Sequence, residues 1–302
     1  MSRRIAITGA SGYIGSALCK DLIDKSFDLI RVSRSTLEPL GNSELLIGDI
    51  CEYDTWANIV KKTDIIFHLA GNTSAYRANN DPMKSLHDTM LPLAHLIKAA
   101  QEFNKVPKLI YASTATVYGL TPAIPINENF ALKPETIYDL HKIFFEKHMN
   151  LAIQQGFMQG VSLRLSNVYG PSPKLNLSDD RGILNKATLA ALHGKSLVVY
   201  GDGNYLRDYI YIDDVVEAFK TVGLSKGFSN TIYNIGTGEG VSVKNAFNLI
   251  AENAVKFTGN PIKIENAAWP NESITIDRRN YIADISNINR ALGWQAKINL
   301  KT

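Results

Sequence analysis

The sequence predicts an α/β fold in which helices cover both faces of a parallel sheet. In the first two thirds of the 302 residues, apolar runs of strand length alternate with segments of helical period. This alternation indicates βαβ units, whose right-handed crossovers favour a doubly wound sheet of the Rossmann type. Strands are expected near 4–8, 28–32, 44–48, 64–69, 107–112 and 160–165, and helices near 12–25, 54–61, 82–103 and 135–155.

The first strand leads directly into a glycine-rich turn, Thr8-Gly9-Ala10-Ser11-Gly12-Tyr13-Ile14-Gly15. A strand, such a turn and a helix start together indicate a dinucleotide-binding unit. The glycines allow a tight turn, close approach to a pyrophosphate and close packing of helix on strand, while the helix N-terminus faces the phosphates. The spacing is G-x-x-G-x-x-G rather than G-x-G-x-x-G, and an ordinary βα turn is the alternative interpretation.

A second motif lies in the helix expected near 135–155. Tyr138 and Lys142 are four residues apart, so their side chains lie on one face of that helix. A free phenol has a pKa of about 10, and an ammonium beside it favours the phenolate. The pair can therefore exchange a proton at neutral pH. By itself the spacing also fits an exposed tyrosine with an unrelated lysine.

Together these two motifs resemble the extended short-chain dehydrogenase/reductases, the family of NAD(P)-dependent nucleotide-sugar epimerases and dehydratases. The resemblance covers nearly the whole chain, because further segments occur in family order. They are Gly48-Asp49-Ile50, His68-Leu69-Ala70-Gly71, the run Ser113 to Gly119, Leu163 to Pro171, Arg207 to Val215, Asn234 to Gly238, and Leu292-Gly293-Trp294.

The resemblance implies a catalytic set of Thr114, Tyr138 and Lys142. Thr114 would hydrogen-bond the reacting sugar oxygen, and Tyr138 would take the proton of a sugar hydroxyl while hydride passes to the nicotinamide. Lys142 would hold the nicotinamide ribose. Family dehydratases generally place a carboxylate soon after the threonine, whereas Ala115-Thr116-Val117 follows here. Dehydration is therefore disfavoured, and A-T-V-Y-G is similar to the UDP-galactose/UDP-glucose type of 4-epimerase.

The choice between NAD and NADP depends on the end of the second strand. Family members that use NAD usually carry an acidic residue there, but this chain has Ser33 followed by Arg34. A serine and an arginine can bind a 2′-phosphate, which favours NADP, although Arg34 also fits a solvated loop cation. The resemblance further implies that Asp49 and Ile50 contact the adenine, with a loop-capping aspartate as the alternative. Leu69, Ala70 and Gly71 would approach the pyrophosphate and ribose.

The substrate side follows from the resemblance alone. Asn167 and Arg207 would bind the diphosphate of a nucleotide sugar, and Tyr200 could stack on the base. Arg279 or Arg278 would add a second diphosphate contact. The alternative for Arg207 is a structural ion pair with Asp208 or Asp213.

The predicted cofactor and substrate residues divide the chain into two parts. Residues 1–170 are expected to form the dinucleotide-binding Rossmann domain, joined by a returning strand near 231–235. Residues 171–302 are expected to form mainly a smaller substrate-binding region, with helices near 183–193, 213–223 and 242–256. The predicted activity is that of a nucleotide-sugar 4-epimerase working through transient oxidation at C4. An NADPH-dependent 4-keto nucleotide-sugar reductase is the rival, and a non-catalytic dinucleotide sensor is a third interpretation.

Composition excludes other classes. The net charge is only +3, with Lys and Arg scattered, so a nucleic-acid partner is not expected. Two cysteines cannot form a disulfide framework and suggest a reducing, cytoplasmic location. The sequence contains no apolar run of membrane-spanning length. Its histidines show no metal-ligand spacing, so no metal is expected.

Long apolar helices near 82–103 and 135–155 would, by resemblance, pair in a homodimer.

Overall fold

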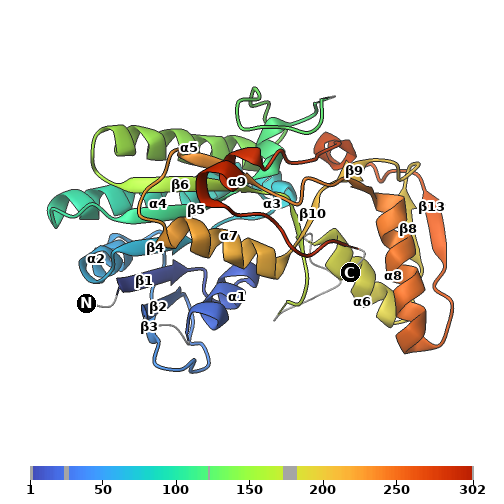
Figure 1. Cartoon of the computed structure of the whole chain (residues 1–302), viewed down its shortest axis with the longest axis horizontal. Helices are drawn as coiled ribbons and strands as arrows, with labels where there is room; N and C mark the ends of the chain where they lie inside the picture. Colours follow the sequence, from blue (N-terminus) through green and yellow to red (C-terminus); the bar gives the residue numbers. More distant parts are fainter. Residues whose placement is uncertain (1–2, 24–26, 122, 173–181, 301–302) are drawn as a thin grey trace.

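The computed structural model describes residues 3–23, 27–121, 123–172 and 182–300, and it confirms the predicted fold class (Figure 1). A seven-stranded sheet has the order β11-β6-β5-β4-β1-β2-β3, and every neighbouring pair is parallel. The strands are β1 (Arg3–Thr8), β2 (Phe27–Ser33), β3 (Glu44–Ile47), β4 (Ile65–His68), β5 (Lys108–Thr114), β6 (Gln159–Leu165) and β11 (Ile232–Ile235).

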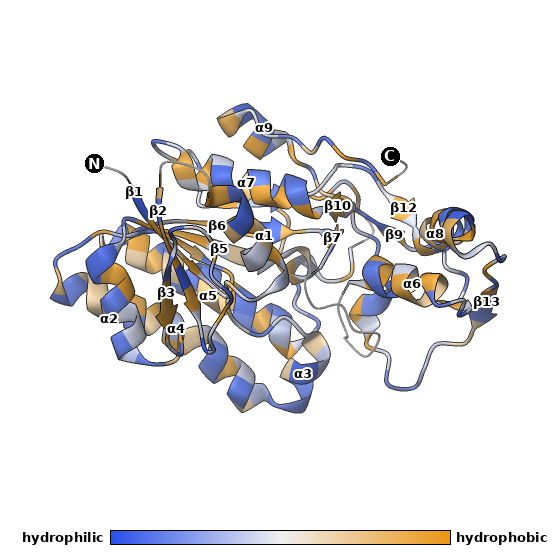
Figure 2. Ribbon diagram, turned by 90° about the horizontal axis from the view of Figure 1, so that it is seen from below, coloured by the Kyte–Doolittle hydropathy of each residue, from blue (hydrophilic) through white to orange (hydrophobic). Residues whose placement is uncertain are grey.

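Helices cover both faces of this sheet (Figure 2). Because successive strand residues point to opposite faces, Ala6 packs in one apolar cluster while Ile5 and Ile7 pack in another. The first cluster includes side chains of α2 (Tyr53–Lys62), α4 (Pro82–Glu102) and α5 (Ile137–Gln154). The second includes side chains of α1 (Tyr13–Leu22), α7 (Ile212–Leu224) and α9 (Ser286–Leu292).

Part of the C-terminal third therefore belongs to the main body. Strand β11 lies beside β6, and α7 and α9 bury Phe219 and Ile288 against the sheet. These elements carry apolar faces that need a large partner, which the sheet supplies. The helix expected near 12–25 is observed as α1, and residues 24 and 25 lie outside the described part of the chain.

The rest of the C-terminal third forms a separate apolar cluster at one end of the molecule (Figure 2). It contains α6 (Ile183–Leu192), α8 (Val243–Thr258) and the parallel pair β8 (Leu197–Tyr200) and β13 (Ile264–Ala267). Two short pairs join it to the main body: β7 (Asn167–Tyr169) with β10 (Tyr209–Tyr211), and β9 (Leu206–Arg207) with β12 (Val241–Ser242).

The sequence did not predict these short pairs, α3 (Ala75–Asn80), or the 3₁₀ turns η1 (Ala115–Tyr118) and η2 (Thr275–Arg278). Segments of two to six residues are too short to show a hydrophobic period. Among the described residues, no helix is both long and apolar enough to cross a membrane.

Candidate active site

A cavity of about 1960 Å³ lies at the carboxyl edge of the sheet, between the main body and the C-terminal cluster. Ligand pockets usually measure about 300–1,000 Å³, so this cavity has room for two ligands. Each candidate site residue named from the sequence, except Arg278, lines it: Gly9, Ser11, Gly12, Tyr13, Ile14, Gly15, Ser33, Arg34, Asp49, Ile50, Leu69, Ala70, Gly71, Thr114, Tyr138, Lys142, Asn167, Tyr200, Arg207 and Arg279.

The glycine-rich turn is held so tightly that it admits no side chain at two of its glycines. Gly9 has a φ of +71°, and a Cβ there would lie 2.7 Å from the Ala70 nitrogen. A Cβ on Gly15 would lie 2.1 Å from the Gly9 carbonyl oxygen. The Gly12 N–H donates to that same oxygen over 2.8 Å. Glycine is therefore required at both positions for the tight packing of this turn against the end of β4 and the start of α1.

Gly15→Ala tests this turn. The added methyl group must push α1 away from the turn, so we expect at least a tenfold rise in the Kd for the dinucleotide, about 1.4 kcal/mol. Titration of purified protein with NAD⁺ measures it. Gly227→Ala is the matched control, because a Cβ at Gly227 meets nothing within 4 Å. Unchanged affinity in Gly15→Ala would contradict the predicted phosphate site.

The ends of β1 and β4 are joined by the Thr8 side chain. Its hydroxyl oxygen accepts hydrogen bonds from the amides of Leu69, at 3.2 Å, and Ala70, at 3.3 Å. The hydroxyl lies 2.7 Å from Nδ1 of His68 and therefore donates its proton to that nitrogen. Burial lowers the pKa of His68 to about 3, so the ring stays neutral. This network fixes the strand ends from which Leu69 and Ala70 line the cavity.

Thr114 and Tyr138 reach the cavity from two different elements. Thr114 ends β5 and caps η1, and its hydroxyl lies 2.9 Å from that of Thr116. Tyr138 lies in the first turn of α5, which Thr136 and Asp139 begin with a capping box. The cap fixes the start of the helix, and with it the position of Tyr138.

Lys142 lies one turn further along α5 and is buried. Its Nζ donates to the Ala112 carbonyl over 2.8 Å and lies 5.6 Å from the centre of the Tyr138 ring. The Tyr111 ring is 4.6 Å away on another side. Burial lowers the pKa of Lys142 to about 7, against the opposing charge of Glu146. The predicted pair thus shares one helix face, within the range of a cation–π contact.

Two arginines, Arg207 and Arg279, line another part of the cavity. Arg207 donates through Nη2 to the Asp277 carbonyl over 2.6 Å, and Arg279 donates through Nη2 to the Asn167 amide oxygen over 3.4 Å. Burial and then the charge of Arg279 lower the pKa of Arg207 to about 9. Within the described part of the chain neither arginine forms an ion pair. Their mutual repulsion favours a bound anion.

The structure gives no support to the alternative in which Arg207 pairs with Asp208. The Asp208 carboxylate accepts hydrogen bonds from the amides of Thr237, Gly238 and Ala283 at 2.8 to 3.1 Å, and from the Thr237 hydroxyl. It is thus used to hold the backbone, which leaves the guanidinium of Arg207 available for a ligand.

Beside the predicted Tyr200, the cavity is lined by two aromatic residues that the sequence analysis missed, Tyr205 and Trp269. Tyr200 lies with its ring centre 5.6 Å from that of Trp269, and Tyr205 accepts a hydrogen bond from the Trp269 indole. The signal available was the Trp-Pro pair after β13. Arg278 lies over the Trp269 ring at 5.3 Å and does not line the cavity. Of the two adjacent arginines, Arg279 is therefore the one placed to contact a ligand.

The residues predicted to choose the cofactor lie at the opposite end. Ser33 is buried, and its hydroxyl accepts from the Ser35 amide over 3.3 Å, whereas Arg34 is exposed. Asp49 accepts from the amide of Cys51 over 2.9 Å, which is the loop-capping role. It also lines the cavity, so capping and an adenine contact are geometrically compatible.

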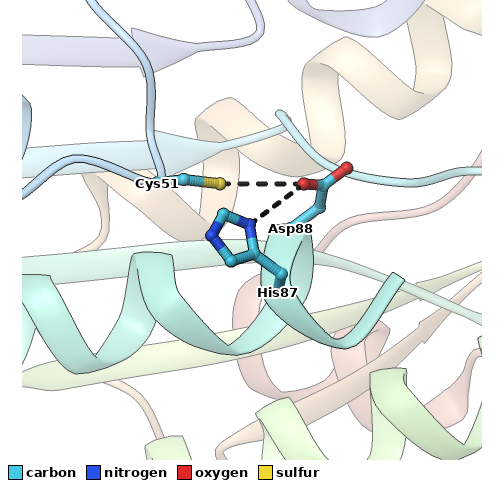
Figure 3. Close-up of side chains that lie close together, drawn as sticks. All are labelled: Cys51, His87 and Asp88. Carbon is cyan, nitrogen blue, oxygen red and sulfur yellow. Dashed lines mark hydrogen bonds and ion pairs between the residues drawn. The ribbon is translucent and has the colours of Figure 1, made fainter. Parts of the chain in front are cut away.

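Cys51 lies beside His87 and Asp88 at this end, which the spacing in the sequence did not indicate (Figure 3). The Asp88 Oδ1 atom is 3.8 Å from the Cys51 sulfur and 3.4 Å from Nδ1 of His87. Asp88 also pairs with Lys84, and burial raises the thiol pKa of Cys51 to about 12. The group is therefore a hydrogen-bonded cluster around a protonated thiol and an already paired carboxylate.

Comparison with known proteins identifies the class. Residues 5–236 match the NAD dependent epimerase/dehydratase family, and the chain belongs to that family, as the resemblance implied. A UDP-glucose 4-epimerase of Mycolicibacterium smegmatis is 30% identical over 82% of both chains. The solved UDP-glucose 4-epimerase of Thermotoga maritima, in complex with UDP-glucose, has a TM-score of 0.87 and 26% identity over 99% of this chain and 95% of that one. The solved structure of MoeE5, in complex with UDP-glucose and NAD, has a TM-score of 0.83 and 25% identity over the same shares.

Proposed function

We propose that this protein is a UDP-sugar 4-epimerase that keeps a nicotinamide dinucleotide bound. The observation that carries the proposal is that one cavity is lined by the glycine turn, by Thr114, Tyr138 and Lys142, and by Arg207 and Arg279. The turn fits a dinucleotide because its glycines let it pack tightly at the start of α1, where its residues line the cavity. The similarity to UDP-glucose 4-epimerases supports the epimerase over the reductase.

The chain's own residues then have distinct tasks. The bound dinucleotide supplies the site that takes hydride from C4 of the sugar and returns it. Tyr138 takes the proton of the C4 hydroxyl and later gives it back, and Thr114 hydrogen-bonds the C4 oxygen. Lys142 lies beside Tyr138 and would hold the cofactor ribose. Arg207 and Arg279 would hold the diphosphate, which lets the sugar turn while its anchor stays fixed.

Two experiments test this proposal. Mass spectrometry identifies any ligand released from freshly purified protein, and an assay without added cofactor follows the interconversion of UDP-glucose and UDP-galactose. Retained dinucleotide with interconversion supports the epimerase. An empty site with NADPH consumption on a 4-keto sugar nucleotide would instead show a reductase. Ser33 and Arg34 lead us to propose that NADP is accepted as well as NAD, and the mass of the released dinucleotide decides between them.

Arg207→Lys is expected to raise the KM for the UDP-sugar by about 10- to 100-fold, because lysine cannot offer two parallel donors to a phosphate. Cofactor affinity should not change. Steady-state kinetics measures the effect. Arg278→Lys is the matched control, since Arg278 lies on Trp269 outside the cavity. Equal KM values in the two variants would contradict the assignment of Arg207 to the diphosphate.

We further propose that residues 1–170, with the strand at 231–235, hold the cofactor. Residues 171–302 would mainly hold the sugar nucleotide, and the protein would be cytoplasmic.

We also propose that the protein forms a homodimer. The dimer is supported by apolar side chains that α4 and α5 expose: Met83 (74%), Leu86 (37%), Phe144 (45%) and Leu151 (55%). The two helices pack side by side, so these residues can form one face. Sedimentation at micromolar concentration should give a dimer, and a monomer would overturn this.

A further inference from the structure

Three side chains with metal-ligating atoms, Cys51, His87 and Asp88, meet between the turn that precedes α2 and the helix α4 (Figure 3). Cys51 belongs to the turn, and His87 and Asp88 belong to α4, so the fold joins positions 37 residues apart. The Cys51 sulfur, one ring nitrogen of His87 and one carboxylate oxygen of Asp88 all lie within 4.8 Å of one another. The proposed function uses none of these three side chains.

The separations of the ligand atoms are close to those of a tetrahedral zinc site. Zinc lies about 2.3 Å from a thiolate sulfur and about 2.0–2.2 Å from an imidazole nitrogen or a carboxylate oxygen, which places neighbouring ligand atoms about 3.4–3.6 Å apart. Oδ1 of Asp88 lies 3.8 Å from the Cys51 sulfur and 3.4 Å from Nδ1 of His87. One cation beside this oxygen therefore reaches all three ligands after small side-chain movements.

The set of donor atoms selects the class of metal. Zn²⁺ binds thiolate, imidazole and carboxylate together, whereas Mg²⁺ and Ca²⁺ prefer oxygen ligands alone. A thiolate and a carboxylate carry two negative charges, which balance a divalent cation. Without a metal, burial and then the charges of Asp49 and Asp88 raise the pKa of the Cys51 thiol to about 12. Those charges attract a cation, and a thiol that coordinates zinc loses its proton.

The groups around the cluster hold its ligands and leave it accessible. The Cys51 amide donates to Oδ1 of Asp49 over 2.9 Å, which fixes the turn that carries the sulfur. Lys84 lies 3.2 Å from Oδ2 of Asp88 and 3.4 Å from its Oδ1, so it orients the carboxylate as an outer partner. The side chains of His87 and Asp88 are 56% and 24% exposed, so a hydrated cation can enter from solvent.

We propose that Cys51, His87 and Asp88 form a Zn²⁺ site with three protein ligands and water in the fourth position. The expectation that this protein binds no metal rested on the spacing of its histidines, and this site needs only one histidine. Cys51 and Asp88 line the cavity, as do Asp49 and Ile50, so the metal would lie at the cavity wall. The inference does not depend on the proposed epimerase function, because metal binding is measured without turnover.

Titration of the purified, untagged full-length protein with Zn²⁺, in competition with a chromophoric chelator, tests the site. The reductant in the buffer must not be a thiol. One Zn²⁺ per chain is expected, and an excess of Mg²⁺ should not displace it. Cys51→Ala and His87→Ala should each raise the Kd for Zn²⁺ by at least about tenfold, since even the outer partners of ligands contribute about 10- to 100-fold. No binding in wild type, or an unchanged Kd in either variant, overturns the proposal.

Co²⁺ in place of Zn²⁺ gives a second readout, because its absorption spectrum reports its ligands. Wild type should show a thiolate-to-Co²⁺ charge-transfer band in the near ultraviolet, and Cys51→Ala should lose it. A band that persists in Cys51→Ala would overturn the assignment of Cys51. The weak visible absorption of six-coordinate Co²⁺, without a charge-transfer band, would show an adventitious ion only and would likewise overturn the site.

Cys19→Ala and His193→Ala are the matched controls. Cys19 is buried in α1, and His193 is exposed at the end of α6, so neither belongs to the cluster. Both variants should bind Zn²⁺ with the wild-type Kd, and a loss in Cys19→Ala equal to that in Cys51→Ala would overturn the proposal. Unfolding temperatures without metal check that each variant is folded. Because His87 is largely exposed, His87→Ala tests the site even if Cys51→Ala is less stable.

Discussion

Tyr138→Phe is expected to lower kcat by about 10²- to 10⁴-fold, the usual contribution of a positioned acid–base group. The ring stays in place at the start of α5, so KM and cofactor affinity should change little. Epimerisation of UDP-glucose, followed in the same preparation with dinucleotide binding, measures both quantities. Lys142→Met should also lower kcat, because it removes the ammonium 5.6 Å from the Tyr138 ring.

Tyr53→Phe is the control for Tyr138→Phe. Tyr53 lies on α2, hydrogen-bonds Glu102 and does not line the cavity. Its loss should leave kcat within about twofold of wild type, because surface changes away from the site have small effects. A Tyr138→Phe enzyme that keeps wild-type kcat would show that another group exchanges the proton, and it would remove the central assumption of the proposed function.

Glu146→Ala is expected to cost about 3–5 kcal/mol in free energy of unfolding, because it leaves a buried guanidinium without its partner. Glu146 and Arg164 are both 2% exposed and meet at 2.6 Å. Glu146 also accepts from Arg164 Nε over 3.0 Å and from the Ser113 hydroxyl over 2.5 Å. This network ties α5, which carries Tyr138 and Lys142, to the strands β5 and β6. Chemical denaturation of the variant measures the loss.

An exposed pair supplies the contrast. Glu265 lies 2.9 Å from Lys263, with side chains 43% and 74% exposed. Water and salt screen this pair, so Glu265→Ala should change the free energy of unfolding far less than Glu146→Ala does. If the two variants lose equal stability, burial is not what makes the Glu146 pair important.

The parts of the fold that were predictable have strong local signals. The strands β1, β2, β4, β5 and β6 are apolar runs bounded by polar or turn residues, and α4 and α5 are long enough to show a helical period. Short elements such as α3 and the pair of β9 with β12 form because tertiary contacts stabilise them, and such contacts leave no period in the sequence. The position of α7 against the sheet is also set by tertiary contacts, because an apolar helix face does not specify which surface it packs against.

The candidate site divides in the same way. The glycine turn and the Tyr138/Lys142 spacing are local patterns, so the sequence by itself determined the family and predicted a dinucleotide site and a proton-exchanging pair. Only the tertiary structure decided which of Arg278 and Arg279 faces the cavity and that Asp208 is already used by backbone amides. The Asp208 contacts, for example, join residues 29 to 75 positions apart, and such packing is set by the whole core rather than by any one segment.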